Sequence, residues 1–452
     1  MFGTVLIANR GEIALRVART CRLLGIRTVA VFSTEDADSP VVRMADQAVR
    51  IGPANPRRSY LNIPAIIEAA RQTGADAIHP GYGFLSENPD FAEVCAANGF
   101  TFIGPSADLM ATLGDKSSAR ALMAETGLPL LPGSIEPVAS VDAALSLASE
   151  IGYPVIVKAV AGGGGRGMGV ANDPAELREV YARNRSAAQM LFGDGRVYLE
   201  RFCARARHVE VQVLGDGRGN AVHLGERDCS VQRRHQKLIE ESPAVGLSRE
   251  LREEICAAAT RATAAVGYSG AGTFEFLVDD AGWYFMEVNC RIQVEHPVTE
   301  MITGVDLVRE QLRIAAGEPL GLAQEDIEFR GAAVECRVNA EDPRRDFFPA
   351  PGRLDEFRVP GGPFVRVDTY GYAGGKVAPS YDSLLAKVVT WGSDRAEAIG
   401  RMDVALEEFL VEGPGIATTA PFLRQVLADS RFRDGVHTTG LVAAMTATAP
   451  AA

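Results

Sequence analysis

The chain has 452 residues, too many for one hydrophobic core, so its length predicts two or three domains. Hydrophobic residues make up 47% and charged residues 23%, as in ordinary globular proteins, and no apolar run is long enough to cross a bilayer. The net charge of −12 argues against a general binder of nucleic acid or anionic membranes, so any phosphate-binding basic cluster must be local.

The chain starts directly with a strand pattern, without the basic region and small-residue cleavage site of a secretory signal. The seven cysteines are scattered and include no Cys-x-x-Cys pair, which predicts free thiols in a reducing compartment. We therefore expect a cytoplasmic protein with neither a zinc site nor a disulfide framework.

Short apolar runs alternate with helical patterns at residues 5–8, 12–24, 27–32, 64–71, 77–79, 91–97 and 101–103. This alternation predicts a doubly wound parallel sheet, and no Gly-x-Gly-x-x-Gly follows the first strand, so no dinucleotide is implied. Residues 79–84 follow a predicted strand end, where ligands collect in such sheets, but a tight Gly/Pro loop without function explains them equally well.

The middle of the chain mixes strands and helices, with strands predicted at residues 154–158, 198–202 and 208–214. Lys158 ends the first of these and precedes a glycine-dense loop at residues 161–169. Bare amides and a lysine make a plausible phosphate clamp, and such a loop also makes a good lid. A flexible hairpin tip remains the alternative, because glycine-rich loops are common.

Two strand patterns, residues 273–278 and 283–288, flank Asp279-Asp280-Ala281-Gly282 and predict a hairpin. If the register places Glu275 opposite Glu287, the like charges are destabilising unless a cation such as Mg²⁺ lies between them. Asn289 would then be a third oxygen ligand. A slip of one residue would separate the two carboxylates, and the sequence does not fix the register.

Polar residues occupy every odd position between residues 287 and 295. In an extended segment they would share one face, which could bind a cation and an oxyanion or could simply be the solvated face of a half-buried strand. The polar residues are Glu287, Asn289, Arg291, Gln293 and Glu295.

Residues 233–237 form a basic cluster in an acidic chain, for which a solvated loop is the usual explanation. Its histidine and glutamine, and its position between strands, favour an active-site contribution. His208 lies on a strand face with Glu210 and Gln212, although a lone strand histidine is more often structural.

The region from residue 330 shows several short strands and then a helix over residues 395–410. Asp394 can cap this helix, and Gly413-Pro414 ends it. The Ala/Thr-rich segment from about Val442 is typical of a frayed end.

Several long motifs carry a family resemblance, at residues 7–14, 79–88, 114–116, 158–169, 226–230, 232–237, 291–297, 335–337 and 381–383. In this order they resemble the ATP-grasp biotin carboxylases, which carboxylate biotin in acetyl-CoA carboxylase and related enzymes. The resemblance runs from Val5 to about His437. It implies an α/β and α+β multidomain fold: a Rossmann-like domain (1–114), an ATP-grasp domain (115–330) with a mobile lid (131–203), a C-terminal mixed α+β domain (331–442) and a tail (443–452).

The resemblance also implies a role for each matching residue. Expected ATP contacts are Lys116, Lys158, Gly164, Gly165, His208, Gln232 and His235, with an adenine hinge at Glu200, Arg201, Phe202 and Cys203. Expected metal ligands, for one or two Mg²⁺ or Mn²⁺ ions, are Glu275, Glu287 and Asn289. Lys237, Arg291, Gln293 and the Val294 amide match a bicarbonate pocket, Glu295 a general base, Arg337 the residue that steadies the biotin enolate, and Tyr82 a neighbour of biotin.

The activity implied is the carboxylation of biotin by ATP and bicarbonate through carboxyphosphate. The chain has no Ala-Met-Lys-Met motif, so we expect biotin on a separate carrier protein, a carboxyltransferase partner and a homodimer. The competing readings are another ATP-grasp carboxylate–amine ligase and a non-catalytic nucleotide-binding regulator. Departures from the family pattern occur at Ala161, Cys203, Ala206 and residues 347–351, none of which touches the proposed chemistry.

Overall fold

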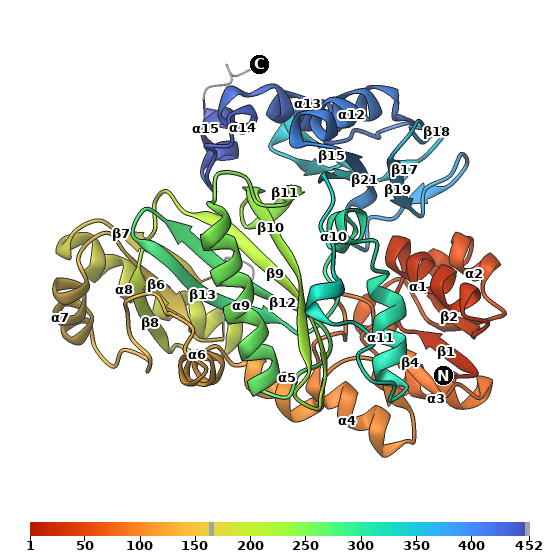
Figure 1. Ribbon diagram of the computed structural model, residues 1–452, viewed down its shortest axis with the longest axis horizontal. Helices are drawn as coiled ribbons and strands as arrows, with labels where there is room; N and C mark the ends of the chain where they lie inside the picture. Colours follow the sequence, from red (N-terminus) through yellow and green to blue (C-terminus); the bar gives the residue numbers. More distant parts are fainter. Residues whose placement is uncertain (162–166, 448–452) are drawn as a thin grey trace.

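The computed structural model describes residues 1–161 and 167–447. Its amino-terminal part is a parallel sheet in the order β3-β2-β1-β4-β5, at the right of Figure 1. The sequence did not predict the edge strand β3, whose residues are mostly polar or exposed. The elements are β1 (Thr4–Ile7), α1 (Gly11–Leu23), β2 (Arg27–Ser33), η1 (Thr34–Asp36), α2 (Pro40–Met44), β3 (Gln47–Gly52), η2 (Pro56–Arg58), α3 (Ile63–Thr73), β4 (Ala77–His79), α4 (Pro89–Ala97) and β5 (Thr101–Phe102).

Strand β1 shows that both faces of this sheet are covered. Val5 and Ile7 pack in a core that includes the apolar side of α1, whereas Leu6 packs in a different core with residues of α3 and α4. Successive strand residues point to opposite faces, so a strand buried on both sides must be apolar throughout. The expected doubly wound parallel sheet is confirmed.

The carboxyl ends of β1 and β4 meet at one edge of the sheet. The Asn9 side-chain nitrogen donates to the Pro80 and Tyr82 carbonyl oxygens, each at 2.7 Å. Because β1 and β4 are neighbours, the turn after one strand fixes the loop after the other. Tyr82 is thereby placed beside the start of α1.

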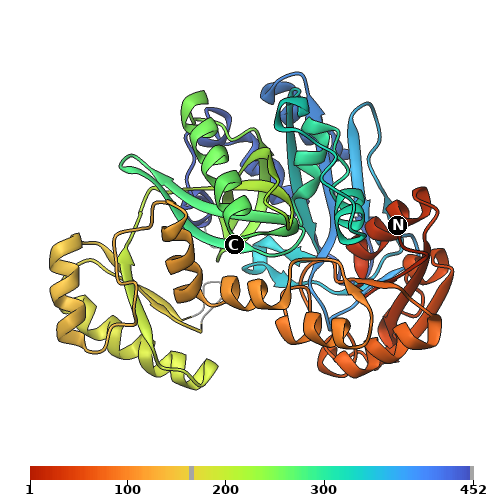
Figure 2. The same cartoon turned by 60° about the horizontal axis from the view of Figure 1, so that its bottom comes forward.

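A smaller antiparallel sheet, in the order β7-β6-β8, forms a separate lobe with α7 and α8. Figures 1 and 2 both show this lobe at the left, projecting from the rest of the molecule. The strands expected to end at Lys158 and near Phe202 are confirmed as β6 and β8. The elements here are α5 (Ala107–Gly114), α6 (Lys116–Glu125), α7 (Val141–Ile151), β6 (Val155–Ala159), β7 (Met168–Ala171), α8 (Pro174–Phe192) and β8 (Val197–Arg201).

An eight-stranded sheet joins the central and carboxyl-terminal parts, in the order β13-β12-β9-β10-β11-β14-β21-β19. The junction is the antiparallel pair β11–β14, where Ile239 faces Cys336. Residues of the last third of the chain therefore continue the surface built by the middle third. The elements are β9 (Arg207–Asp216), β10 (Ala221–Arg233), β11 (Gln236–Ser242), α9 (Arg249–Ala265), β12 (Ser269–Asp279), β13 (Gly282–Asn289), α10 (His296–Thr303), α11 (Leu307–Ala315), η3 (Gln324–Asp326), β14 (Ala332–Asn339), β19 (Val365–Thr369) and β21 (Leu384–Gly392).

The helix expected from about residue 395 to residue 410 is confirmed as α12, which begins after its Asp394 cap and ends at Glu408, before a short strand, β22, that pairs with β18. The expectation for the end of the chain was wrong. The segment expected to fray from Val442 lies in helix α15, where Val442 is buried. The remaining elements are β15 (Glu341–Asp342), η4 (Pro343–Arg345), β16 (Phe348–Pro349), β17 (Gly352–Arg353), β18 (Glu356–Arg358), β20 (Lys376–Val377), α12 (Arg395–Glu408), β22 (Leu410–Glu412), α13 (Ala420–Ala428), α14 (Ser430–Arg433) and α15 (Leu441–Ala447).

All seven cysteines are buried free thiols, as the sequence predicts. In the described ranges, no helix is both long enough and apolar enough for a membrane crossing.

The helical layer over the carboxyl-terminal part yields a stability prediction. Leu423 on α13 is fully buried, so Leu423→Ala leaves a cavity and should cost about 2–5 kcal/mol. The measurement is the urea midpoint of unfolding, with Val404→Ala on the exposed side of α12 as the control. Equal midpoints for the two variants would contradict the packing of α13.

Candidate active site

A cavity of about 1380 Å³ lies where the parts of the chain meet, and most of the candidate residues line it. Glu295 does not line it: this residue is fully buried behind the wall. Gly164 and Gly165 lie outside the described residues. Candidate residues on the wall are Tyr82, Lys116, Lys158, Glu200, Arg201, Phe202, Cys203, His208, Gln232, His235, Lys237, Glu275, Glu287, Asn289, Arg291, Gln293, Val294 and Arg337.

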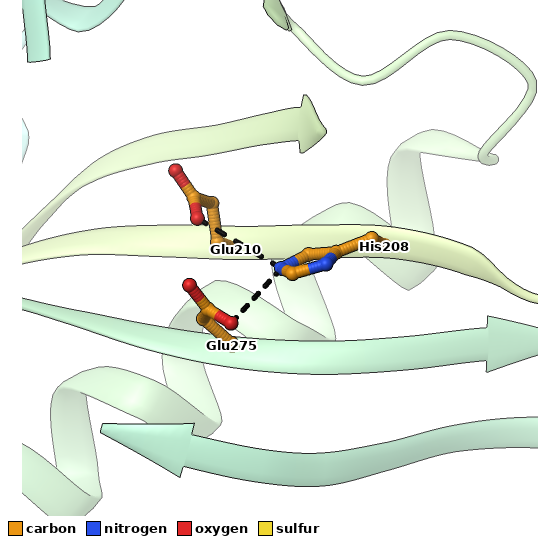
Figure 3. Close-up of side chains that lie close together, drawn as sticks. All are labelled: His208, Glu210 and Glu275. Carbon is orange, nitrogen blue, oxygen red and sulfur yellow. Dashed lines mark ion pairs between the residues drawn. The ribbon is translucent and has the colours of Figure 1, made fainter. Parts of the chain in front are cut away.

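Three carboxylates form a row across the large sheet. Glu287 on β13 faces Glu275 on β12, and Glu275 faces Glu210 on β9. The register left open by the sequence is therefore the one that opposes the two glutamates, and a bulge follows immediately at Phe276. Figure 3 shows Glu210 and Glu275 side by side on neighbouring strands, with the His208 ring beside them and one ring nitrogen facing both carboxylates. Such a row of like charges requires cations to be stable.

Lys237 supplies most of the positive charge that this row of carboxylates needs. Its ammonium donates to Glu210 Oε2 at 2.5 Å, to Glu295 Oε1 at 2.5 Å and to Glu275 Oε1 at 2.9 Å. Lys237 follows the tight turn between β10 and β11, where Arg234 and His235 both adopt positive φ. The basic cluster at residues 233–237 is thus not only a solvated loop: its last residue enters the carboxylate row.

A second cation, Arg227, holds the far end of the row. Its guanidinium is fully buried and donates to Glu210 Oε1 at 2.6 Å, to Gln212 at 2.8 Å and to Thr299 at 2.9 Å. Both oxygens of Glu210 are therefore occupied by cations of the protein, one by Arg227 and the other by Lys237.

The pKa values in the row follow from this arrangement. Burial raises the pKa of Glu275, but Lys237 and His208 outweigh burial and bring it below its usual range. Burial and the charge of Glu275 raise the pKa of Glu287. Burial lowers the pKa of Lys237, but the three carboxylates around it raise it well above its usual value. Among the described residues, Glu287 is thus the member of the row that lacks a strong cation partner.

Two sets of side chains along this row could hold a hard cation. The ligand atoms of His208, Glu210 and Glu275 lie within 4.8 Å of one another. Two cations of the protein, Arg227 and Lys237, already compensate the charge of Glu210, however. Glu287 has a raised pKa and needs a cation, so Glu275, Glu287 and Asn289 fit Mg²⁺ or Mn²⁺ better. The Asn289 side-chain nitrogen already donates to Glu275 Oε1 at 2.8 Å, which leaves its oxygen facing Arg291.

Residues 287–295 do not form one extended segment, so the condition for a shared strand face is not met. Strand β13 ends at Asn289, and α10 begins at His296. Arg291, Gln293 and Glu295 reach the site from the loop between the two elements. These three side chains meet at the site because of the path of this loop and not because of strand periodicity.

This loop presents donors to the cavity. Arg291 is held by Glu87 Oε2 at 2.9 Å and also donates to Gln293 at 3.1 Å. The side-chain nitrogen of Gln293 is buried and has no hydrogen-bond partner among the described residues. Buried amide nitrogens are normally paired, so this orphan donor on the cavity wall marks a place for an oxygen-bearing ligand.

Arg337 lies between two buried carboxylates. Its Nε donates to Glu240 Oε1 at 2.6 Å, and its Nη2 donates to Glu295 Oε2 at 2.8 Å. Burial raises the pKa of Glu240 to about 7, against the opposing effect of Arg337. Burial also raises the pKa of Glu295, but Lys237 and Arg337 outweigh it and bring that pKa well below the usual value. Glu295 is therefore ionised at neutral pH.

In the lobe, Glu200 on β8 binds Lys158 on the neighbouring strand β6 and also Arg120 on α6. Lys158 donates to Glu200 Oε2 at 2.5 Å, and Arg120 donates to the other oxygen. Burial lowers the pKa of Lys116, which stands nearby. The Glu200 carboxylate is thus used in holding cations. At Cys203, which departs from the family pattern, the thiol lies 3.6 Å from Arg201.

Sequence reasoning missed several residues of this site. Arg120 and Glu240 carry no local signal, because their importance comes from burial beside an opposite charge. Three signals existed: Glu87 lies within the motif at residues 79–88, Arg227 lies within the motif at residues 226–230, and Glu210 shares a strand face with His208.

Comparisons with known proteins agree with this geometry. Family models described as "Biotin carboxylase, N-terminal domain", "Carbamoyl-phosphate synthase L chain, ATP binding domain" and "Biotin carboxylase C-terminal domain" match residues 1–110, 115–323 and 335–444. The biotin carboxylase of Pseudomonas aeruginosa is 54% identical over 436 residues, which cover 96% of each chain. The chain therefore belongs to the biotin carboxylase family, and it is a ligase.

Two solved structures show the same fold. A biotin carboxylase–βγ-ATP complex from Campylobacter jejuni has a TM-score of 0.95 at 47% identity, covering 98% of this chain and 99% of that one. The biotin carboxylase domain dimer of 2-oxoglutarate carboxylase from Hydrogenobacter thermophilus, in complex with MgADP, ADP and bicarbonate, has a TM-score of 0.94 at 47% identity, covering 98% of both chains. The ATP-grasp fold class expected from the sequence is confirmed.

Removing the central cation tests the electrostatics of the row. Lys237→Met leaves three buried carboxylates without their shared partner and should destabilise the protein by about 3–5 kcal/mol, measured as a lower melting temperature. Lys376→Met is the control, because Lys376 pairs with Glu35 at the exposed surface. Similar melting temperatures for both variants would show that Lys237 does not hold the row together.

Proposed function

We propose that the protein carboxylates biotin on a separate carrier protein, using ATP and bicarbonate through carboxyphosphate. One observation carries the proposal: a single cavity joins the carboxylate row at Glu275 and Glu287 to the donors Arg291, Gln293 and Arg337. An ordinary carboxylate–amine ligase has no need of those donors, and a regulator has no need of an ionised Glu295. Neither alternative is favoured.

For phosphoryl transfer, the chain supplies cations and positioning and needs no covalent chemistry. Lys116 and Lys158 would bind the ATP phosphates, with His208, His235, Gln232 and the Gly164–Gly165 stretch as further contacts. Glu275, Glu287 and Asn289 would hold one or two Mg²⁺ or Mn²⁺ ions. The metal would supply positive charge for the transferring phosphoryl group.

Glu200 to Cys203 would meet the adenine, and residues 131–203 would act as the lid. The Glu200 carboxylate already binds Lys158 and Arg120. The contact with adenine would therefore be made by backbone groups of these residues. The proposed domain bounds are 1–114, 115–330 and 331–442, although the large sheet continues across the second boundary.

Bicarbonate would lie on Lys237, Arg291, Gln293 and the Val294 amide. Bicarbonate is a poor nucleophile until it loses its proton, and the ionised Glu295 carboxylate can accept that proton. Without substrate, Lys237 and Arg337 both donate to Glu295 and lower its pKa. A bicarbonate that shares these donors would make Glu295 a stronger base.

Carboxyphosphate would then break down to CO₂ and phosphate, and the phosphate would take the proton from the biotin ureido nitrogen. The negative charge developing on the ureido oxygen needs a fixed donor. Arg337 is a permanent planar cation, held in place by Glu240 and Glu295. Tyr82 lines the same cavity and would border biotin.

The proposed partners are a biotin carboxyl carrier protein, a carboxyltransferase subunit and a second copy of this chain, as in the H. thermophilus dimer. We place the protein and its partners in the cytoplasm, where free thiols stay reduced. The final acceptor belongs to the carboxyltransferase: the similar proteins include a biotin carboxylase, a pyruvate carboxylase subunit and a 2-oxoglutarate carboxylase domain.

The overall reaction is tested by ADP release from Mg²⁺-ATP, with and without bicarbonate and free biotin. We expect release to depend on both. ADP release that bicarbonate does not stimulate would overturn the proposal.

Arg337→Ala should lower biotin carboxylation about 10²–10³-fold, because it removes a donor to the developing oxyanion. The affinity for ATP, measured by nucleotide titration, should stay within about twofold, because this donor acts on the oxyanion that forms during the reaction and not on bound ATP. Arg353→Ala, at an exposed site of the same region, is the control. An equal loss of nucleotide binding and carboxylation would count against the role of Arg337.

Glu275→Gln should weaken Mg²⁺-dependent nucleotide binding about 10–100-fold, because it removes a charged ligand. The measurement is a Mg²⁺ titration of ADP release. Glu253→Gln, on the exposed side of α9, should leave the Mg²⁺ dependence unchanged. An unchanged dependence in Glu275→Gln itself would mean that the two carboxylates do not share a cation.

A further inference from the structure

Lys387 on β21 is a fully buried lysine that does not line the cavity. Its ammonium donates to the Val294 carbonyl oxygen at 2.8 Å and lies 3.1 Å from Glu12 Oε1. Asp368 Oδ2 is farther away, at 3.9 Å. A buried ammonium is costly unless it is paired, so these contacts fix the position of Lys387.

The sheet places Lys387 directly beside Arg337. Arg337 on β14 faces Lys387 on β21, and Lys387 faces Asp368 on β19. Residues paired across strands point to the same side of a sheet. The buried ammonium therefore lies on the same face as the guanidinium that we assign to biotin, one strand further from the cavity.

One contact of Lys387 reaches the bicarbonate loop. The Val294 carbonyl belongs to the peptide plane that also holds the Glu295 nitrogen and Cα. A hydrogen bond to this carbonyl therefore sets the orientation of the Val294–Glu295 peptide, next to the proposed base. The loop is otherwise held by Arg291 with Glu87 and by the first turn of α10.

The other contact reaches the biotin side. Glu12 on α1 is buried, and its Oε1 accepts from both Lys387 and the Tyr82 hydroxyl. Burial raises the pKa of Glu12, and Lys387 opposes that rise. Without the ammonium, Glu12 would lose the charge that favours its ionised form. Tyr82 would then lose a charged hydrogen-bond acceptor.

We propose that Lys387 is a positioning residue for two substrates at once. Through the Val294 carbonyl it orients the bicarbonate loop, and through Glu12 it orients Tyr82 at the biotin side. One ammonium thus couples the amino-terminal sheet, the loop before α10 and the carboxyl-terminal strands. The inference rests on the proposed function.

The test uses the full chain with Lys387→Met, which keeps the length of the side chain and removes its charge. We expect the KM for bicarbonate and the KM for biotin each to rise about tenfold, since small misplacements of reacting groups are costly. The KM for ATP should stay within about twofold, because no nucleotide contact changes.

Glu12→Gln separates the two contacts. It should raise the KM for biotin and leave the KM for bicarbonate near that of the wild type, because Lys387 still holds Val294. Arg395→Met is the structural control: it breaks the buried pair with Glu241, whose nearest oxygen is 2.5 Å away, outside the cavity wall. This control should lower the melting temperature without raising the KM for bicarbonate or biotin relative to the KM for ATP.

The inference is overturned if Lys387→Met leaves both KM values unchanged, or if the KM for ATP rises in parallel with them. If Lys387→Met does not fold, Glu12→Gln decides: a rise confined to biotin supports the inference, and no rise overturns it. Failure of the proposed function is a separate result, because the wild type itself would then show no bicarbonate-dependent ADP release.

Discussion

The Lys237 ammonium, shared among Glu210, Glu275 and Glu295, is the interaction on which this site depends. Three carboxylates on neighbouring strands and a fourth in an adjoining loop would repel one another in a buried cavity. The lysine allows Glu210, Glu275 and Glu295 to lie close together. Among the described residues Glu287 has no strong cation partner, and this remaining demand for positive charge makes the row suitable for a metal–nucleotide complex.

The continuous eight-stranded sheet explains why one cavity can hold two chemistries. Arg337 comes from the carboxyl-terminal strands, yet it donates to Glu240 on β11 and to Glu295 in the loop before α10. The phosphoryl end and the biotin end of the cavity are thus two positions along one continuous sheet. The lobe carrying Lys158 approaches from the side and is joined to the main body through Glu200 and Arg120.

Local patterns in the sequence predicted much of the fold and part of the site. Alternating apolar runs predicted the parallel sheet, and Asp279–Gly282 predicted the hairpin that opposes Glu275 and Glu287. The register was beyond reach, because a bulge at Phe276 and the pairing with β9 decide it. Periodicity also failed at Arg291, where the chain leaves the sheet.

The residues missed entirely share one property: each is a charged group whose partner is distant in the chain. Arg120 pairs with Glu200, and Lys387 pairs with Glu12. No local window of sequence reports a buried ion pair of this kind. The family resemblance supplied roles for residues that contact substrates. It supplied none for the residues that hold those substrate-contacting residues in place.

The most direct measurement is a crystal structure with Mn²⁺, a non-hydrolysable ATP analogue and bicarbonate, in which anomalous scattering locates the metal. The account predicts a manganese peak between Glu275 and Glu287, with bicarbonate on Arg291 and Gln293 and with Lys237 still beside Glu295. A peak at His208, Glu210 and Glu275 instead, with Glu287 bound to no metal, would contradict it.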